Sequence, residues 1–306
     1  MLNFLFFQNL NLLLHYKMRV LITGSNGQLG LEIRELETNY KKLDLVFKDL
    51  PALDICNFNL LQSFIIDNNI NAVINCAAYT AVDKAEQDAE IAEEVNSKGV
   101  LNLVKALKSV NGKLIHISTD YVFNGDHFMP YNESDYVSPI GVYGETKREG
   151  ELAVINSALD AIVIRTSWLY SSYGNNFVKT MLRLAKQKEE LSVIFDQVGT
   201  PTYARDLAKT CLKILCGGSS VNISKNGNLY HYSNEGVASW YDFAISIMKI
   251  GGENCKVKPI QTKDYPTLAK RPQYSVLNKS KIKTDFKIEI PYWRDSLKDC
   301  IEKIMN

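Results

Sequence analysis

Short apolar runs alternate with amphipathic, helix-like segments along most of the chain. The apolar runs are rich in Val, Ile and Leu, as is typical of buried strands, and they predict strands at residues 20–22, 44–47, 54–55, 72–78, 113–118, 161–165 and 228–233. Segments with helical spacing separate many of them and predict helices at 31–39, 58–68, 93–109, 178–188 and 239–250. This strand–helix alternation predicts an α/β fold, a Rossmann-type doubly wound parallel sheet with right-handed crossovers.

The same alternation predicts two domains. Residues 18–170 would form a dinucleotide-binding domain, and residues 171–306 mainly a smaller C-terminal substrate-binding domain, with the run at 228–233 returning to the sheet. Residues 1–17 are apolar but interrupted by Asn and Gln, lack the features of a secretory signal, and are too short and too polar to span a bilayer. We interpret them as an extension without function; a segment lying weakly on a membrane surface is the alternative.

A glycine-rich turn follows the first predicted strand. Gly24, Gly27 and Gly30 have the spacing G-x-x-G-x-x-G and directly precede the predicted helix at 31–39. Glycines at such a turn let the backbone approach a pyrophosphate, and the helix N-terminus favours its negative charge. The pattern predicts a dinucleotide site, with a plain tight turn as the alternative.

The residues after the next two predicted strands bear on the choice of cofactor. Lys48 and Asp49 should lie near the adenosine ribose, where an acid favours the free 2′-hydroxyl of NADH and a base favours the 2′-phosphate of NADPH. Because both are present, the sequence leaves NADPH and NADH open. Asp54 and Ile55 either end a strand beside the adenine or form a turn before the next helix.

Three side chains of complementary chemistry are predicted to meet after the strand at 113–118. Tyr143 and Lys147 are four residues apart, so they share one face of a helix. Thr119 would present its hydroxyl at the carboxyl edge of the sheet. A phenol whose pKa is lowered by a nearby ammonium can donate a proton to a carbonyl oxygen while hydride reaches the carbon. All three are candidate catalytic residues; an ordinary exposed helix face is the alternative explanation for the Tyr–Lys spacing.

Other polar positions have two interpretations. Asn96 faces inward with apolar neighbours and needs a partner, either a backbone group or a water chain near Lys147. Asn176 and Phe177 suit a sugar diphosphate, although their helix could simply pack on the sheet. Arg271 suits a phosphate group, with a surface salt bridge as the alternative.

Composition and net charge indicate which kinds of partner and which cellular compartment suit the protein. Lys and Arg number 35 against 34 Asp and Glu, a net charge of +1, so nothing suggests a nucleic-acid or membrane partner. Six cysteines without C-x-x-C or zinc spacing favour a reducing cytoplasm and buried free thiols. Two histidines and two tryptophans stand in apolar patterns and are interpreted as core residues: His116, His231, Trp240 and Trp293. Partners must therefore be inferred from the candidate sites.

The ordered motifs resemble those of the extended short-chain dehydrogenase/reductase family: Gly24-x-x-Gly27-x-x-Gly30, Asn75-Cys-Ala-Ala78, Ser118-Thr119-Asp120 and Tyr143-x-x-x-Lys147. Within this family, further motifs are similar to those of the dTDP-4-dehydrorhamnose reductases. These are S-T-D-Y-V-F-N-G at 118–125, Y-x-E at 131–133, P-x-x-V-Y-G-x-T-K at 139–147, R-T-S-W-L-Y at 165–170, G-N-N-F-V-K-T-M at 174–181, D-Q-x-G-x-P-T at 196–202 and R-P-x-x-S-x-L at 271–277. The resemblance runs from residue 18 almost to the C-terminus.

The resemblance implies reduction of the C4 keto group of dTDP-4-dehydro-L-rhamnose with NADPH or NADH, in the synthesis of dTDP-rhamnose for cell-surface polysaccharide. It implies that Tyr143 donates the proton, that Lys147 holds the nicotinamide ribose and tunes the phenol, and that Thr119 adjusts the phenol or orients the sugar. It also implies cofactor positions at Gly27, Gln28, Leu29, Asp54, Ile55, Ala77, Ala78, Tyr79, Tyr143 and Lys147, and sugar-nucleotide positions at Thr119, Asp120 and Trp168. By analogy with a magnesium ion held by glutamate at the family's dimer interface, Glu32 is one candidate Mg²⁺ ligand in a homodimer.

Three other functions use the same scaffold. A sugar-nucleotide dehydratase would have Asp-Glu after the threonine, whereas Asp120 is followed by Tyr121, which leaves no group to relay a proton to a departing hydroxyl. The spacing does not exclude an epimerase that keeps its nicotinamide bound. A non-catalytic nucleotide-binding regulatory subunit would need the fold but not the proton donor, so the intact Thr119, Tyr143 and Lys147 favour an enzyme.

Overall fold

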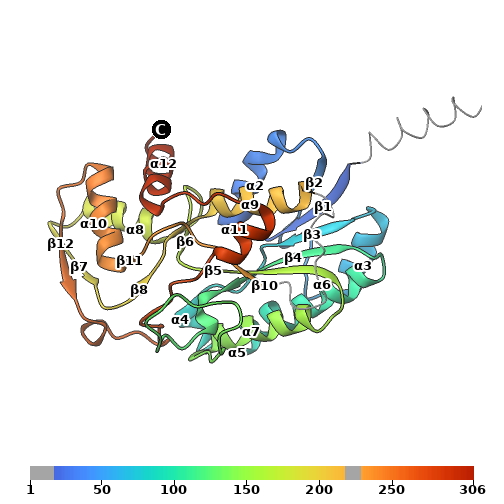
Figure 1. Ribbon diagram of the computed structural model, residues 1–306, viewed down its shortest axis with the longest axis horizontal. Coiled ribbons are helices and arrows are strands. Elements are labelled where there is room, and N and C mark those ends of the chain that lie inside the picture. Colours follow the sequence, from blue (N-terminus) through green and yellow to red (C-terminus); the bar gives the residue numbers. More distant parts are fainter. Residues whose placement is uncertain (1–16, 218–228) are drawn as a thin grey trace, which may run out of the picture.

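A six-stranded parallel sheet forms the centre of the molecule (Figure 1). The computed structural model describes residues 17–217 and 229–306, so the interpretation of residues 1–17 lies outside the described residues except at Lys17. The strand order is β10-β5-β4-β3-β1-β2, and every neighbouring pair is parallel. The strands are β1 (Met18–Thr23), β2 (Leu43–Phe47), β3 (Ala72–Asn75), β4 (Lys113–Thr119), β5 (Asp160–Thr166) and β10 (Leu229–His231). The predicted doubly wound parallel sheet is confirmed.

Helices cover both faces of this sheet (Figure 1). On one face lie α2 (Gln28–Leu36), α9 (Ala204–Cys216) and α11 (Ser280–Phe286), and on the other α3 (Phe58–Asp67), α6 (Gly99–Lys108) and α7 (Val142–Ile155). Successive side chains of a strand point to opposite faces. Val20 and Ile22 therefore join the core on the α2 and α9 side, while Leu21 between them joins the core on the α3 and α6 side.

A second lobe packs around its own apolar core. Its helices are α8 (Phe177–Ala185), α10 (Trp240–Gly251) and α12 (Trp293–Met305). Two-stranded sheets complete it: β6 (Leu169–Tyr170) with β9 (Thr202–Tyr203), β7 (Glu190–Ile194) with β12 (Lys256–Ile260), and β8 (Val198–Gly199) with β11 (Ala238–Ser239). Trp293 is fully buried in this core, as predicted, and Trp240 packs against it. The remaining short elements are α4 (Val82–Ala85), α5 (Ala89–Glu93), η1 (Glu37–Asn39), η3 (Asp120–Val122) and η4 (Thr262–Asp264).

The predicted strand at 54–55 is wrong, and the alternative, a turn, is what forms. The Asp54 carboxylate accepts a hydrogen bond from the Cys56 amide at 2.9 Å, and the Asp54 carbonyl accepts one from the Asn57 amide at 3.2 Å. Local side-chain bonding of this kind competes with strand pairing. The predicted helix at 93–109 is also divided, because a π-helix, η2 (Glu94–Lys98), precedes α6.

A buried ion pair fastens α7 to the sheet. Arg165 on β5 donates to both carboxylate oxygens of Glu151, from Nε at 2.7 Å and from Nη2 at 2.8 Å. Both side chains are fully buried, and Arg148 adds a third bond to Glu151 at 2.8 Å from a partly exposed position. Glu151 lies four residues after Lys147, so the pair fixes the helix that carries the candidate catalytic residues.

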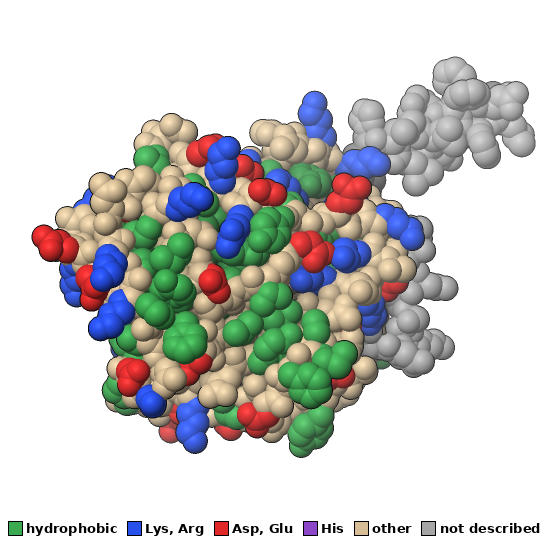
Figure 2. Space-filling view, turned by 60° about the vertical axis from the view of Figure 1, so that its left-hand side comes forward, with side chains coloured by type: hydrophobic (Ala, Val, Ile, Leu, Met, Phe, Trp, Pro, Cys, Tyr) green, Lys and Arg blue, Asp and Glu red, His purple; other side chains and the backbone are tan. Residues whose placement is uncertain are grey.

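The surface carries charges of both signs. On the face shown in Figure 2, Lys and Arg side chains are interspersed with Asp and Glu rather than gathered in one patch. No helix within residues 17–217 and 229–306 combines the length and the apolar character needed to cross a bilayer. All six cysteines are free thiols, as predicted, but only three of them, Cys211, Cys255 and Cys300, are buried; the other three are half-buried.

Candidate active site

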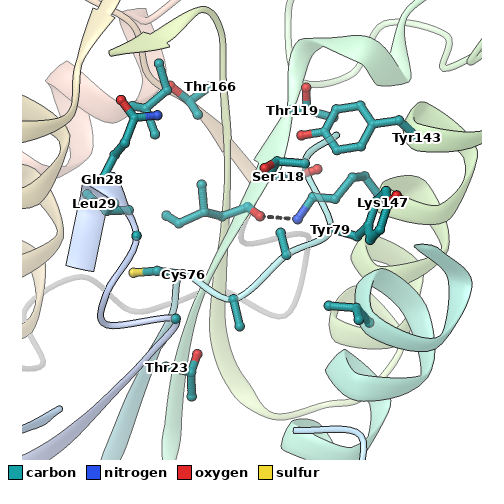
Figure 3. A pocket seen from close by; sticks show the side chains of 18 of the residues that line it. Thr23, Gln28, Leu29, Cys76, Tyr79, Ser118, Thr119, Tyr143, Lys147 and Thr166 are labelled. Carbon is teal, nitrogen blue, oxygen red and sulfur yellow. Dashed lines mark hydrogen bonds between the residues drawn. The ribbon is translucent and has the colours of Figure 1, made fainter. Parts of the chain in front are cut away.

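A pocket of about 820 Å³ lies at the carboxyl ends of the parallel strands. Open α/β sheets generally bind ligands at this edge. Figure 3 shows the glycine-rich turn with Gln28 and Leu29 on one side and Thr119, Tyr143 and Lys147 on the other. The pocket is lined by Asp49 and by fourteen of the residues proposed as catalytic, cofactor or sugar-nucleotide positions: Gly24, Gly27, Gln28, Leu29, Asp54, Ile55, Ala77, Ala78, Tyr79, Thr119, Asp120, Tyr143, Lys147 and Trp168.

Two glycines of the turn are required by close backbone contacts. Gly24 has φ +59°, and a Cβ there would lie 2.6 Å from the Ala77 amide nitrogen. Gly30 does not line the pocket; a Cβ there would lie 2.5 Å from the Ser25 Cα, so this glycine lets the first turn of α2 pack on the loop. The N-terminus of α2 then opens toward the pocket, in the geometry that suits a pyrophosphate.

The opposite wall is formed by the end of β4 and the start of α7. The Glu86 carboxylate accepts a hydrogen bond from the Val142 amide at 3.0 Å at the first turn of α7. A Cβ at Gly144 would lie 2.2 Å from the Tyr121 carbonyl oxygen, so only glycine lets α7 approach this closely. The helix thereby presents Tyr143 and Lys147 on one face, as predicted, beside Thr119 (Figure 3).

The pKa values of this pair correct one expectation. Burial raises the pKa of Tyr143 to about 12, and a hydrogen bond with Thr119 only partly offsets this. Lys147 was expected to lower that pKa, but its ammonium points down to the Ile117 carbonyl, with Nζ to O at 2.6 Å. Burial in turn lowers the pKa of Lys147 to about 8, while Glu151 acts to raise it. Tyr143 is thus a fully protonated phenol at neutral pH, ready to donate rather than to accept.

Two polar groups at the strand ends add to the site. Asp120 is buried, and this burial raises the pKa of its carboxyl to about 6, although hydrogen bonds with Ser275 and Thr119 act to lower it. Thr166, which the sequence reasoning missed, ends β5 directly beside Thr119 in the register of the sheet. Its hydroxyl is buried, lines the pocket and has no hydrogen-bond partner among the described residues. Its position at the carboxyl end of a predicted strand is the sequence feature that could have identified Thr166 as a site residue.

Asn96 has the backbone partner that was one of its two predicted alternatives. Its amide donates to the Tyr79 carbonyl at 3.1 Å, and its carbonyl accepts from the Tyr79 amide at 2.9 Å. It also contacts the Thr146 hydroxyl at 3.2 Å. Through Asn96, the π-helix η2 therefore connects the pocket-lining segment 77–79 to α7. Such π-turns often mark functional sites.

An aromatic stack supports the far end of the pocket. Trp168 has φ +47° and lies flat against Trp240, with ring centroids 3.7 Å apart and an interplanar angle of 9°. A Cβ at Gly199 would lie 2.7 Å from the Trp168 ring, which leaves room only for glycine. Trp240 therefore does more than fill the core, because it supports the ring of Trp168, a pocket-lining residue whose backbone has a positive φ.

The predicted core histidines stay in the core. His116 and His231 are fully buried. Burial and the nearby Lys147 lower the pKa of His116 well below its usual value, and burial with Arg165 lowers that of His231 to about 3. Both rings are neutral and unsuited to act as bases at neutral pH.

Two predicted substrate residues lie outside the pocket lining. Asn176 caps α8, accepting from the Lys179 amide at 3.1 Å, while its amide group donates to the Gln28 side chain at 3.0 Å. Arg271 forms a two-pronged ion pair with Asp83, at 2.6 and 3.1 Å. The salt-bridge alternative for Arg271 is thus what the structure contains.

The predicted magnesium site at Glu32 is not supported. Glu32 is fully buried; its Oε1 accepts from the Ser171 hydroxyl at 2.6 Å, and its Oε2 lies 3.1 Å from Arg205 and 3.2 Å from Lys303. Mg²⁺ requires a set of oxygen ligands in near-octahedral geometry, and no three His, Cys, Asp or Glu side chains gather to hold a metal within the described parts of the chain. The residues present do not fit the ion.

Comparisons with known proteins agree with this geometry. The family described as "RmlD substrate binding domain" matches residues 18–306. A curated dTDP-4-dehydrorhamnose reductase of Aggregatibacter actinomycetemcomitans is 41% identical over 290 residues, covering 92% of this chain and 97% of that protein. A crystal structure of a Clostridium acetobutylicum dTDP-4-dehydrorhamnose reductase is 42% identical with a TM-score of 0.87, covering 94% and 100% of the two chains. The Bacillus anthracis enzyme, solved in complex with NADP, is 39% identical with a TM-score of 0.88, covering 94% and 99%.

Proposed function

Because the chain belongs to the RmlD substrate-binding-domain family, we propose that it is an NAD(P)H-dependent oxidoreductase that reduces the C4 keto group of dTDP-4-dehydro-L-rhamnose to give dTDP-L-rhamnose. One observation carries the proposal: Thr119, Tyr143 and Lys147 line one pocket together with the glycine-rich turn. The division into a cofactor-binding part at 18–170 and a mainly substrate-binding part at 171–306 belongs to the same proposal.

The side chains account for the proton of this reaction. When bound, the reduced nicotinamide supplies the hydride that the C4 carbon accepts. Tyr143 gives its phenolic proton to the C4 oxygen, and Thr119, which bonds the phenol, stabilises the phenolate that is left. The Lys147 ammonium holds the ribose hydroxyls of the cofactor and adds positive charge beneath the site. Solvent then returns the proton to Tyr143.

We propose NADPH as the cofactor, in line with the NADP complex of the Bacillus anthracis relative. The acid expected to favour NADH, Asp49, already accepts two backbone hydrogen bonds. Its Oδ2 accepts from the Asn26 amide and its Oδ1 from the Leu50 amide, each at 2.8 Å, so a ribose hydroxyl would have to share these oxygens. Lys48 precedes it in the sequence, and a base at this position favours the 2′-phosphate of NADPH.

The proposal is tested by supplying NADPH or NADH with dTDP-4-dehydro-L-rhamnose generated in situ. Cofactor oxidation is followed by absorbance, and dTDP-L-rhamnose is identified by mass spectrometry and NMR. We expect stoichiometric oxidation and product formation, faster with NADPH. Binding of NADPH without its oxidation, with this and other 4-keto sugar nucleotides, would instead favour a nucleotide-binding regulatory subunit.

The pH dependence of cofactor binding should report on Lys147. Because burial lowers its pKa to about 8, it carries a charge below that pH and loses it as the pH rises. A charged hydrogen-bond donor contributes about 1 kcal/mol more than a neutral one. We therefore expect the Kd of NADPH, measured by fluorescence titration, to rise roughly five- to tenfold from neutral pH to well above 8. Lys147→Ala should bind weakly throughout and lack this step; the same step in that variant would assign the titration to another group.

A further inference from the structure

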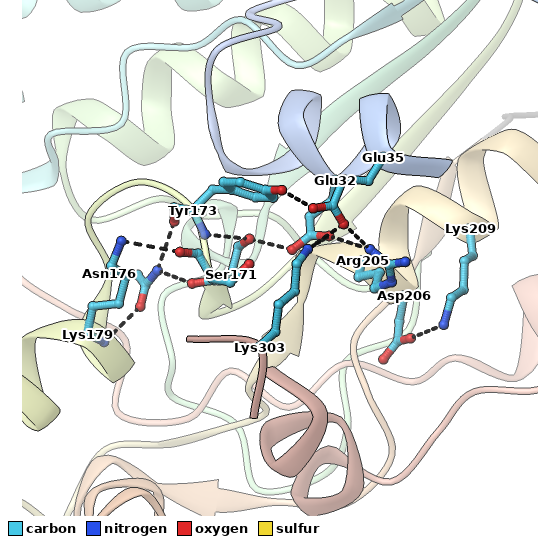
Figure 4. Close-up of polar contacts among 11 residues, drawn as sticks. Glu32, Glu35, Ser171, Tyr173, Asn176, Lys179, Arg205, Asp206, Lys209 and Lys303 are labelled. Carbon is cyan, nitrogen blue, oxygen red and sulfur yellow. Dashed lines mark hydrogen bonds and ion pairs between the residues drawn. The ribbon is translucent and has the colours of Figure 1, made fainter. Parts of the chain in front are cut away.

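Four charged side chains from three helices meet behind the pocket wall (Figure 4). Glu32 and Glu35 come from α2, Arg205 from the first turn of α9, and Lys303 from the last turns of α12. Arg205 and Lys303 each approach Glu32 Oε2, at 3.1 and 3.2 Å, and each lies 2.5 Å from Glu35 Oε2. Two carboxylates thus face two cations, and the cluster is balanced in charge.

Two hydroxyl groups complete this cluster, which we call the clasp: Glu32, Glu35, Ser171, Tyr173, Arg205 and Lys303. Ser171 donates to Glu32 Oε1 at 2.6 Å, and the Tyr173 hydroxyl donates to Glu35 Oε1. Every oxygen of both carboxylates therefore has at least one donor. Partial burial would raise the pKa of Glu35, but hydrogen bonds from Lys303, Tyr173 and Arg205 lower it to about 2.

The clasp fixes a segment that forms part of the pocket. Ser171 and Tyr173 precede Gly174 and Asn175, which line the pocket. Gly174 has φ +62°, and a Cβ there would lie 3.1 Å from the Gln28 side chain. The contacts of Ser171 and Tyr173 with α2 thus seat the segment 171–176 against the helix whose first residues, Gln28 and Leu29, line the same pocket.

We propose that Arg205 and Lys303 supply, as fixed side-chain charges, the positive charge that a divalent ion would otherwise place beside Glu32, so that the pocket wall is held without metal. Every oxygen of Glu32 and Glu35 already has a donor, and the two carboxylates are already balanced by two cations. An entering cation would have to displace two cations that lie within 3.2 Å of the Glu32 carboxylate, and would take from each of them one of its two carboxylate partners. The segment 171–176 is held against α2, whose two carboxylates are in turn paired with Arg205 on α9 and Lys303 on α12.

The first arm of the test measures the melting temperature of the full chain with excess EDTA and with saturating magnesium chloride. A ligand that binds only the folded state must raise the melting temperature. We expect the same value in both conditions. A rise with magnesium, or a fall with EDTA, would overturn the proposal. This arm uses no turnover, so its outcome is independent of whether the proposed reaction occurs.

The second arm compares Lys303→Met with Lys298→Met. Both lysines lie on α12, but Lys298 is largely exposed, and its ion-pair partner among the described residues is Glu302, at 3.8 Å. We expect Lys303→Met to lower the melting temperature by roughly 2–6 °C and to weaken NADPH binding severalfold, because Glu32 loses a partner and the segment 171–176 loosens. Lys298→Met should leave both quantities unchanged. Equal behaviour of the two variants would show that the clasp does not hold the wall.

Discussion

Tyr143→Phe should lower kcat by roughly 10²- to 10⁴-fold while leaving the Kd of NADPH nearly unchanged. The substitution removes only the phenolic hydroxyl, and the ring keeps its edge contact with Tyr121, whose centroid lies 5.5 Å away. The reaction would lose its proton donor but keep its binding surfaces. The measurement pairs steady-state NADPH oxidation with a fluorescence titration of the cofactor.

Tyr121→Phe is the matched control, because Tyr121 lines the same pocket and its ring touches Tyr143. Loss of this second hydroxyl should change kcat far less. If Tyr143→Phe instead kept near-normal turnover, the proton would have to come from another group, and Asp120, with a pKa raised by burial to about 6, would be the first to examine.

Arg165→Met should destabilise the protein by about 3–5 kcal/mol, the usual cost of leaving one half of a buried ion pair without its partner. Glu151 is fully buried, and after the substitution its remaining ion-pair partner among the described residues would be Arg148, which is partly exposed. The free energy of unfolding would be measured by urea denaturation.

Two further variants separate the cost of an unpaired buried charge from the loss of an ordinary ion pair. Lys113→Met breaks an exposed pair with Asp160 at the other end of the same strands, and it should cost less than about 1 kcal/mol. Combining Arg165→Met with Glu151→Leu removes both buried charges and should recover much of the loss. If Arg165→Met were no worse than Lys113→Met, the pair would not be what anchors α7.

The sheet and the reactive face of α7 were predictable because both depend on local patterns. Runs of Val, Ile and Leu locate the strands, and spacing by four residues places Tyr143 over Lys147. The rule that ligands bind at the carboxyl edge of a parallel sheet then brings Thr119 to the same place. The hydroxyl of Thr166 follows from the same rule but lacks a motif that draws attention to it.

The site predictions that the structure corrects concern contacts between distant parts of the chain, whereas the error at 54–55 comes from local hydrogen bonds of Asp54. Arg271 pairs with Asp83, 188 residues away, and Lys303 reaches Glu32 across 271 residues. No periodic pattern in the sequence identifies such a distant partner. From the sequence alone, an arginine that binds phosphate or a glutamate that binds a metal therefore looks the same as one member of an ion pair. The Lys147 ammonium bonds the Ile117 carbonyl because of how α7 packs on β4, and the spacing of Tyr143 and Lys147 in the sequence does not predict this contact.

The edge strand β10 has a consequence for how this architecture can be recombined. It enters the sheet beside β5, with Leu229 opposite Val163 and His231 opposite Arg165, after the chain has already built part of the other lobe. A single crossover that replaced everything after β5 with the sequence of a relative would therefore exchange the edge of the sheet along with the second lobe. Chimeras that aim to change the sugar nucleotide accepted should instead retain β10 and use two junctions, one on each side of it.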